Sequence, residues 1–282
     1  MTTRFAPSPT GHLHIGHAYA AMVARDLARQ HDGTFLLRFE DIDFTRVRPE
    51  FYDAIEEDLR WLDIRWTGTP LRQTQRHKAY ATALDTLRRQ DLVYPCFCTR
   101  KEIQNEIAGM SNAPHGPEGP LYPGTCRAIS NEQRAHRLAS EDAHCWRLDA
   151  TAADASTGPL TFTDSSLGTI PVDPSLLGDV VLARKDIATS YHLAVVVDDA
   201  HQDITHVTRG NDLVASTHVH RLLQTLLGFP EPAYHHHALV TNPDGMRLAK
   251  RDQSTTLRNL RAAGHAPSDI SQLIQARLAP PQ

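Results

Sequence analysis

Hydrophobic and polar positions over the first third of the chain follow the pattern of a strand, a helix and a second strand. Residues 3–6 have the character of a short strand, residues 15–30 carry apolar positions at helical spacing, and residues 34–39 form a second apolar run. Another helix is expected from residue 48, where Pro and Glu follow. This alternation predicts a Rossmann-type parallel sheet with helices on its faces, where ligands bind beyond the carboxyl ends of the strands.

The pattern changes between about residues 94 and 174. This stretch is rich in Cys, Gly, Pro and His, with strand-like pieces at residues 146–148 and 160–162 and little helical period. We interpret it as an inserted α+β domain.

The α/β pattern returns after the insertion. The apolar run at residues 193–199 predicts a buried strand, residues 216–227 a helix, and residues 238–241 a further strand. After residue 251 the chain has room for about two helices. The expected organisation is a first half of the Rossmann-type domain over 1–93, the insertion over 94–174, the second half over 175–254 and a helical tail over 255–282.

Composition places the chain among ordinary globular proteins. Of its 282 residues 40% are hydrophobic and 22% charged, and no stretch approaches the ~20 apolar residues of a membrane helix. We therefore expect a cytoplasmic protein. The formal charge of −4 does not indicate a nucleic-acid binder, but residues 246–261 hold five basic residues against one acid, and phosphate attraction depends on such local patches.

Candidate chemistry begins with residues 4–11 (RFAPSPTG) and 14–17 (HIGH). A Gly/Pro loop running into a helix start can hold phosphate through free backbone N–H groups and the helix dipole. His14 and His17 share one face there, and Gly16 leaves room for an adenine ring. Taken alone, two such histidines in a chain with 17 would be surface residues.

These two segments resemble the first signature of class I aminoacyl-tRNA synthetases of the glutamyl and glutaminyl branch. A second signature, the Lys-Met-Ser-Lys-Ser loop, is matched by residues 247–251 (RLAKR), which differ by an initial Arg and a central Ala. The resemblance implies that Lys250 stabilises phosphate charge, an effect of about 3 kcal/mol in the transition state. It assigns catalysis to His14, His17 and Lys250, and ATP binding to the same three residues and Gly16.

The resemblance also implies a glutamate pocket. Arg4 and Arg209 would bind carboxylates, Glu40 the ammonium group, and Tyr191 would donate a hydroxyl. Outside these motifs, Glu40 and Arg209 would be an ordinary ion pair at strand ends. The substrate carboxylate would then attack the α-phosphate of ATP, with Mg²⁺ assisting and no protein nucleophile. The full implied set is Arg4, Phe5, Ala6, Pro7, Ser8, Glu40, Tyr191 and Arg209.

Three of the four cysteines suggest a metal site. Cys96, Cys98 and Cys126 could supply three thiolates to Zn²⁺, and either Tyr122 or His115 could complete a tetrahedral shell. On ligand chemistry alone His would be favoured. Short glutamyl-synthetase-like proteins carry Cys-x-Cys followed by Tyr-x-x-x-Cys, and this resemblance implies Tyr122. Cys145 is expected to be a structural thiol.

The length of chain after residue 251 distinguishes members of the glutamyl and glutaminyl branch from one another. A full glutamyl-tRNA synthetase continues into an anticodon-binding domain, whereas this sequence ends at residue 282. It therefore looks like the stand-alone members that transfer glutamate to the queuosine base of tRNA(Asp). The expected partners are L-glutamate, ATP and that anticodon stem-loop, held by the insertion and the basic stretch, and a monomer is expected. The alternatives are an enzyme charging another acceptor, a small-molecule glutamyl ligase or nucleotidyltransferase, and a silent tRNA-binding module.

Overall fold

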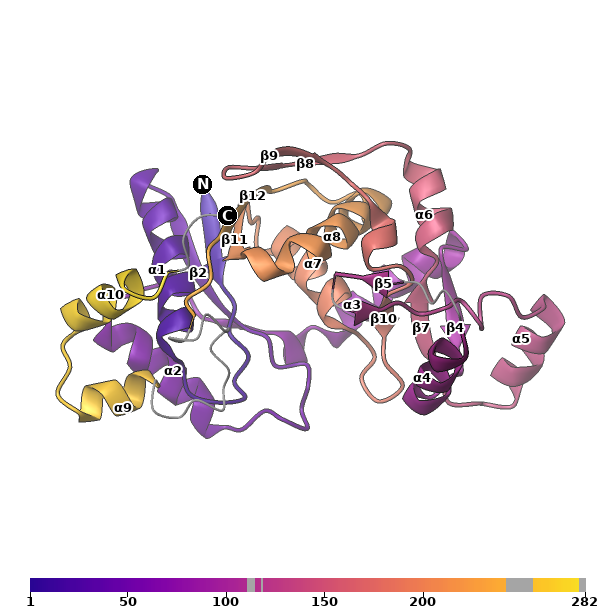
Figure 1. The fold of residues 1–282 in the computed structure, drawn as a ribbon, viewed down its shortest axis with the longest axis horizontal. Helices are drawn as coiled ribbons and strands as arrows, with labels where there is room; N and C mark the ends of the chain where they lie inside the picture. The colour runs from indigo at the N-terminus through magenta and orange to yellow at the C-terminus, as the bar shows by residue number, and fades with distance from the viewer. Residues whose placement is uncertain (111–114, 118, 242–255, 279–282) are drawn as a thin grey trace.

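The computed structural model describes residues 1–110, 115–117, 119–241 and 256–278 (Figure 1). Helices and strands alternate over the first part of this chain, as predicted. The predicted second signature, Lys250 included, and most of the basic stretch lie outside the described residues. No helix within the described ranges is long and apolar enough to cross a membrane.

The N-terminal half of the sheet is parallel, as the sequence predicts. Strands β1 (Thr2–Phe5), β2 (Thr34–Phe39) and β3 (Leu71–Arg72) pair in the order β1-β2-β3. Helix α1 (Ile15–Gln30) packs on β1 and β2 through small side chains, because its buried residues include four alanines that allow close approach. The predicted helix bounds of α1 and strand bounds of β2 agree with the structure.

The second half of the sheet lies beside β1. Strands β11 (His206–Gly210), β12 (Ala233–His237) and β8 (Thr161–Asp164) run parallel, and β9 (Gly168–Pro171) closes the edge antiparallel to β8. The Thr205 backbone N–H donates to the Thr2 carbonyl at 3.1 Å, which ties the start of β11 to β1. The carboxyl ends of β1 and β11 therefore share one edge.

The predicted strand at residues 193–199 is wrong. This segment is part of helix α7 (Tyr191–His201), in which every residue from Leu193 to Asp199 is buried. Helix α7 packs against α3 (His77–Arg89), α8 (Val214–Leu227) and β10 (Val181–Ala183). A helix covered on several sides carries an unbroken apolar run, so periodicity cannot distinguish it from a buried strand.

The predicted strand at residues 238–241 is also displaced. The strand in this region is β12, which includes the three histidines His235 to His237. Of the predicted segment, Val240 makes a single bridge to Leu278. Polar composition hid β12, because Tyr234, His236 and His237 are buried by tertiary contacts and not by a hydrophobic pattern in the strand.

The insertion holds more helix than its composition predicts. Helices α4 (Arg100–Gly109), α5 (Asn131–Ala139) and α6 (Ala150–Thr157) fall within it. Thr99 with Glu102 and Ser130 with Gln133 form capping boxes at the first two, a signal present in the sequence. Neither α4 nor α5 has a buried residue, so the few apolar positions that they carry are not part of a core.

A separate antiparallel sheet organises the insertion. Its order is β10 (Val181–Ala183), β7 (Cys145–Leu148), β4 (Val93–Cys96), and a short hairpin joins β5 (His115–Gly116) to β6 (Gly119–Pro120). Strands β8 and β9 precede residue 174 yet pair with β12 of the large sheet. The predicted domain boundaries stay predictions.

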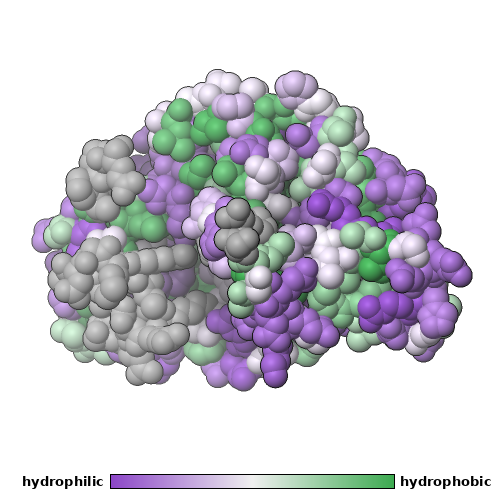
Figure 2. Space-filling view, turned by 45° about the vertical axis from the view of Figure 1, so that its right-hand side comes forward, coloured by the Kyte–Doolittle hydropathy of each residue, from purple (hydrophilic) through white to green (hydrophobic). Residues whose placement is uncertain are grey.

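The remaining helices cover the sheet and its edges. The predicted helical tail is confirmed by two helices, α9 (Leu257–Ala262) and α10 (Pro267–Gln275). Helix α10 packs against α1, as Figure 1 shows at the far end from the insertion. Hydrophilic residues gather at the insertion end of the surface in Figure 2, whereas hydrophobic residues lie in small scattered groups. Besides α9 and α10, the remaining helices are α2 (Glu50–Trp61) and the 3-10 helices η1 (Gln73–Gln75), η2 (Pro174–Leu176) and η3 (Asn211–Leu213).

Candidate active site

A cavity of about 580 Å³ opens at the carboxyl ends of β1, β2 and β11. It is lined by the described residues that the sequence assigns to ATP and glutamate, which come from widely separated segments. A slightly larger cavity, about 660 Å³, lies between α1 and α10 and contains none of them. The assigned residues lining the first cavity are Arg4, Phe5, Ala6, Pro7, Ser8, His14, Gly16, His17, Glu40, Tyr191 and Arg209.

The two histidines of the opening signature lie side by side at the start of α1. His14 caps the helix: the Gly16 backbone N–H donates to its Nδ1 at 3.1 Å, and the His14 N–H donates to His17 Nδ1 at 3.2 Å. The ring centroids are 3.8 Å apart. A Cβ at Gly16 would lie 3.0 Å from the His14 ring, so a side chain there would press on it. Both rings are thus held at the positive end of a helix dipole.

Arg4 lies in the cavity wall with a carboxylate of the protein already bound. Its Nε and Nη2 donate to the two Asp199 oxygens at 2.9 and 3.2 Å, and its Nη1 donates to the Thr208 carbonyl at 3.2 Å. Arg38 donates to the same Asp199 carboxylate at 2.7 Å. Sequence reasoning missed Arg38 and Asp199. The acidic pair at the end of the buried run 193–199 was the available signal, because a buried acid needs a cationic partner.

Glu40 stands at the end of β2 in a largely dry position. Burial raises its pKa to about 7, and this outweighs the opposing effects of Arg38 and Arg4. The nearest cation recorded for it is Arg38, at 4.0 Å. No ion pair joins Glu40 to Arg209 in the described part of the chain, so the two are not the ordinary pair that their strand-end positions allowed.

Arg209, on β11, is buried among neutral groups. It donates to Tyr191 Oη at 3.4 Å, to His220 Nδ1 at 2.9 Å and to Thr217 Oγ1 at 2.5 Å. Its Nε contacts His236 at 3.3 Å. Among the residues that the structure describes, no carboxylate lies within 4.0 Å of this guanidinium.

The arginines around the cavity differ in their partners. Arg4 and Arg38 share the carboxylate of Asp199, and Glu40 lies at the limit of contact with Arg38. Asp212 also lines the cavity. The uncompensated member is Arg209, and an unpaired buried charge costs free energy until a ligand supplies its partner.

A smaller cavity, of about 410 Å³, adjoins the cavity of about 580 Å³ that contains the assigned residues. Ser8, Glu40 and Tyr191 line both. The wall between the two is therefore made of the residues that the sequence assigns to glutamate.

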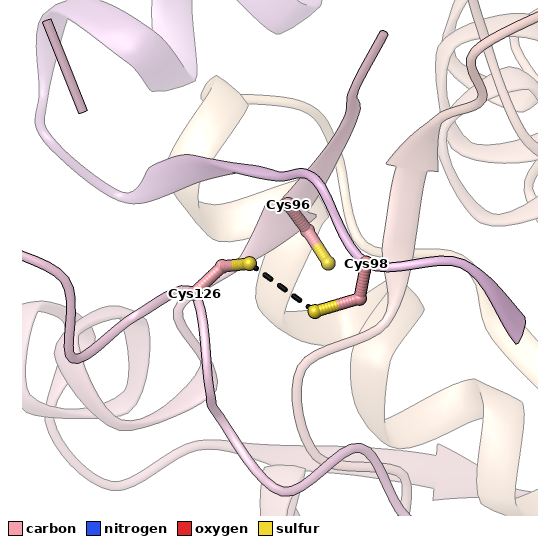
Figure 3. Close-up of side chains that lie close together, drawn as sticks. All are labelled: Cys96, Cys98 and Cys126. Carbon is pink, nitrogen blue, oxygen red and sulfur yellow. Dashed lines mark hydrogen bonds between the residues drawn. The ribbon is translucent and has the colours of Figure 1, made fainter. Parts of the chain in front are cut away.

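Three cysteine thiols meet in the insertion. The sulfur atoms of Cys96, Cys98 and Cys126 all lie within 4.8 Å of one another, and Figure 3 shows them pointing toward a common centre. Cys98 and Cys126 are closest, with sulfurs 3.3 Å apart. The cysteines are free, and three converging thiols suit Zn²⁺.

Tyr122 is the oxygen donor near these sulfurs. Its hydroxyl lies 3.4 Å from Cys96 Sγ and 3.7 Å from Cys98 Sγ. His115 lies in the exposed β5–β6 hairpin and is not part of the cluster. A hydrogen bond from Cys145 lowers the pKa of Cys96 to about 4, whereas burial raises that of Cys98 to about 12. A cation between the sulfurs would favour the thiolate at both.

The fold is that of a class I tRNA synthetase catalytic domain. The family model for tRNA synthetases class I (E and Q), catalytic domain, matches residues 1–281. Solved structures agree: a glutamate tRNA ligase from Elizabethkingia meningosepticum in complex with its amino acid has a TM-score of 0.74, 28% identity and coverage of 89% of this chain. A glutamate-tRNA synthetase from Elizabethkingia anophelis has a TM-score of 0.76 at the same identity and coverage of this chain. This chain spans about half of each, 52% and 53%.

Curated relatives narrow the class. A glutamyl-Q tRNA(Asp) synthetase from Rhodobacter capsulatus is 47% identical, over 97% of this chain and 99% of its own length. Another from Nocardia farcinica is 44% identical over 99% of this chain and 85% of its own length. This chain belongs to the family of glutamyl-Q tRNA(Asp) synthetases.

Proposed function

We propose that this protein activates L-glutamate with ATP and transfers it to the queuosine base of tRNA(Asp). The observation that carries the first step is the unpaired charge of Arg209 in a cavity that also contains His14 and His17. The names of its relatives, which state glutamyl-Q and tRNA(Asp), support the second.

Glutamate fits the cavity with its side-chain carboxylate toward Arg209 and Tyr191. Both groups donate hydrogen bonds there, and the buried guanidinium gains the anionic partner it lacks. The ammonium group then belongs at Glu40, which becomes a carboxylate when a cation displaces its proton. Arg4, held by Asp199, is a wall of the pocket and a weaker carboxylate ligand than its sequence context suggests.

ATP fits the other end of the cavity, where α1 begins. His14 and His17 would contact the phosphates there, and Gly16 leaves space for the adenine ring. The α-carboxylate of glutamate would attack the α-phosphate in line, with pyrophosphate leaving. Lys250 and Mg²⁺ would neutralise phosphate charge in this step. Positioning supplies most of the rate, because the substrate provides the nucleophile.

The acceptor base would approach from the adjoining cavity. That space shares Ser8, Glu40 and Tyr191 with the glutamate pocket, so a base bound in it would be next to the activated carboxyl group. The insertion and the basic stretch would hold the anticodon stem-loop through phosphates and unstacked bases. Zinc, held by Cys96, Cys98 and Cys126 with Tyr122, would stabilise the insertion and take no part in the chemistry.

Two assays test this function. Exchange of pyrophosphate into ATP, measured without tRNA, should occur with glutamate. It should be at least about 100-fold weaker with glutamine, because glutamine gives the charge of Arg209 no anionic partner. Labelled glutamate should enter tRNA(Asp) that contains queuosine and not the same tRNA lacking it. Absence of exchange with and without tRNA would contradict the enzyme, and equal labelling of both tRNAs would favour an enzyme that charges another acceptor.

A further inference from the structure

The side chains behind Arg209 form a second layer that does not reach the cavity. His220, on α8, and His236, on β12, are almost fully buried and are not part of the cavity wall. His220 contacts Arg209 at 2.9 Å on one side and His192 at 3.1 Å on the other. His236 contacts Arg209 at 3.3 Å and Asp164 at 2.7 Å.

The donors in this layer determine the hydrogen positions. A guanidinium can only donate, so His220 must present a bare Nδ1 to Arg209 and carry its hydrogen on Nε2. That hydrogen then points at His192 Nδ1. Likewise, His236 must carry its hydrogen on Nδ1, toward Asp164, and offer Nε2 to Arg209. Both imidazoles are therefore neutral.

The same neutrality follows from burial and from Arg209 itself. Burial and the nearby guanidinium lower the pKa values of His192 and His236 to about 4 and that of His220 well below its usual value. The acid in this chain of contacts, Asp164, contacts His236, which lies between it and Arg209. It accepts hydrogen bonds from the Ser166, Leu167 and His236 backbone N–H groups as well as from the His236 ring.

The layer thus differs from the one behind Arg4. Arg4 and Arg38 are both held by the carboxylate of Asp199, which neutralises part of their charge. Arg209 is also fixed by several hydrogen bonds, but the groups that accept them are neutral. An acid in the place of His220 would give equal hydrogen bonding and remove the charge that an anionic ligand needs.

We propose that His220, oriented by His192, is a positioning and specificity-determining residue that holds Arg209 without neutralising it and thereby sets the preference for glutamate over glutamine. This inference rests on the proposed function, because it gives Arg209 the role of binding the side-chain carboxylate. The new element is that selectivity depends on a neutral residue outside the pocket, which touches no substrate.

The decisive experiment compares His220→Asp with His220→Asn. Both place an oxygen near the Nδ1 position and have nearly the same size. They differ in charge and in the N–H donor that Asn, unlike Asp, can direct toward His192. For His220→Asn we expect a KM for glutamate within a few-fold of the unmodified enzyme in the pyrophosphate exchange assay. For His220→Asp we expect a KM roughly 10- to 100-fold higher than for His220→Asn, with the KM for ATP unchanged. The ratio of kcat/KM for glutamate to that for glutamine should fall by a similar factor.

Equal KM values for the two variants, with both folded by circular dichroism, would overturn the proposal. This outcome is distinct from failure of the proposed function, in which the unmodified enzyme itself shows no glutamate-dependent exchange. If neither variant folds, neutron diffraction of the unmodified protein decides. We expect hydrogen on His220 Nε2 and none on Nδ1, and a doubly protonated His220 would overturn the proposal.

Discussion

Single residues of the cavity owe their chemistry to what surrounds them. Glu40 is largely buried and Asp199 is buried, and both acids lie near the same arginines, yet their pKa values move in opposite directions. Asp199 receives direct hydrogen bonds from Arg4 and Arg38, and these outweigh its burial. Glu40 is at the limit of contact with Arg38, and burial dominates. Glu40 therefore can give up its proton to a bound ammonium group, whereas Asp199 stays charged as a structural anion.

A pH dependence of glutamate use follows from Glu40. Because its pKa is raised to about 7 and the ammonium group needs the carboxylate form, kcat/KM for glutamate should fall below pH 7 by about tenfold per pH unit. Initial rates of exchange between pH 5.5 and 8.5 measure this. The control is Glu40→Gln, whose kcat/KM should be low and should lack that fall. A flat profile for the unmodified enzyme would contradict the assignment.

At the scale of elements, α7 connects the site to the core. Its apolar residues pack between α3, α8 and β10, while Asp198 and Asp199 at its end hold two sets of polar partners. Asp198 accepts from Gln73, Arg76 and Tyr80 at 2.7 to 3.0 Å. Through Asp199, helix α7 thus fixes the orientation of Arg4. In this way a residue from the second half of the chain positions a residue from the first half.

Removing the Asp199 charge should destabilise the protein. Asp199→Asn leaves two buried arginines without their shared counter-ion, and losing one partner of a buried pair costs about 3 to 5 kcal/mol of unfolding free energy. Asp85→Asn is the matched control, because Asp85 forms an exposed helical pair with Arg88, worth about 0.5 kcal/mol. Urea unfolding would measure both. Equal losses would show that the Asp199 pairs contribute no more than a surface bridge.

At the scale of the whole molecule, the insertion is built on a small core. The sheet and its helices share much larger clusters, whereas the buried cluster of the insertion is small and has Cys98 packed against it. Its members are Tyr94, Cys96, Phe97, Cys126 and Cys145. A core of this size supplies little hydrophobic stabilisation by itself. The thiols at its centre, when they bind a metal, would add the missing stability.

Metal removal should therefore act on the insertion first. The purified protein should contain about one zinc ion per chain by elemental analysis. Chelation should lower the temperature of an early thermal transition and leave a later one, from the large sheet, nearly unchanged. Cys98→Ser should lose the metal. Cys145→Ala, which alters a buried neighbour outside the three-thiol group, should keep it, and equal zinc content in the two variants would contradict the ligand assignment.

The amino-acid sequence by itself determined the local features. The opening loop and α1, the strand β2, and the three-cysteine motif depend on neighbouring residues, so their spacing and periodicity were enough to place them. The two signatures supported the family for the same reason, since the residues within each signature are close together in the chain.

Tertiary structure decided what depends on distant partners. Helix α7 reads as a strand because its burial comes from elements far away in sequence, and β12 was missed because its histidines are buried by a fold that no local window contains. The pairing of Arg4 with Asp199 spans 195 positions. The neutral layer around Arg209 joins residues of three elements, α7, α8 and β12. Electrostatic environment is a property of positions in space, so only the folded chain distinguishes an arginine that is already paired from one that still needs an anion.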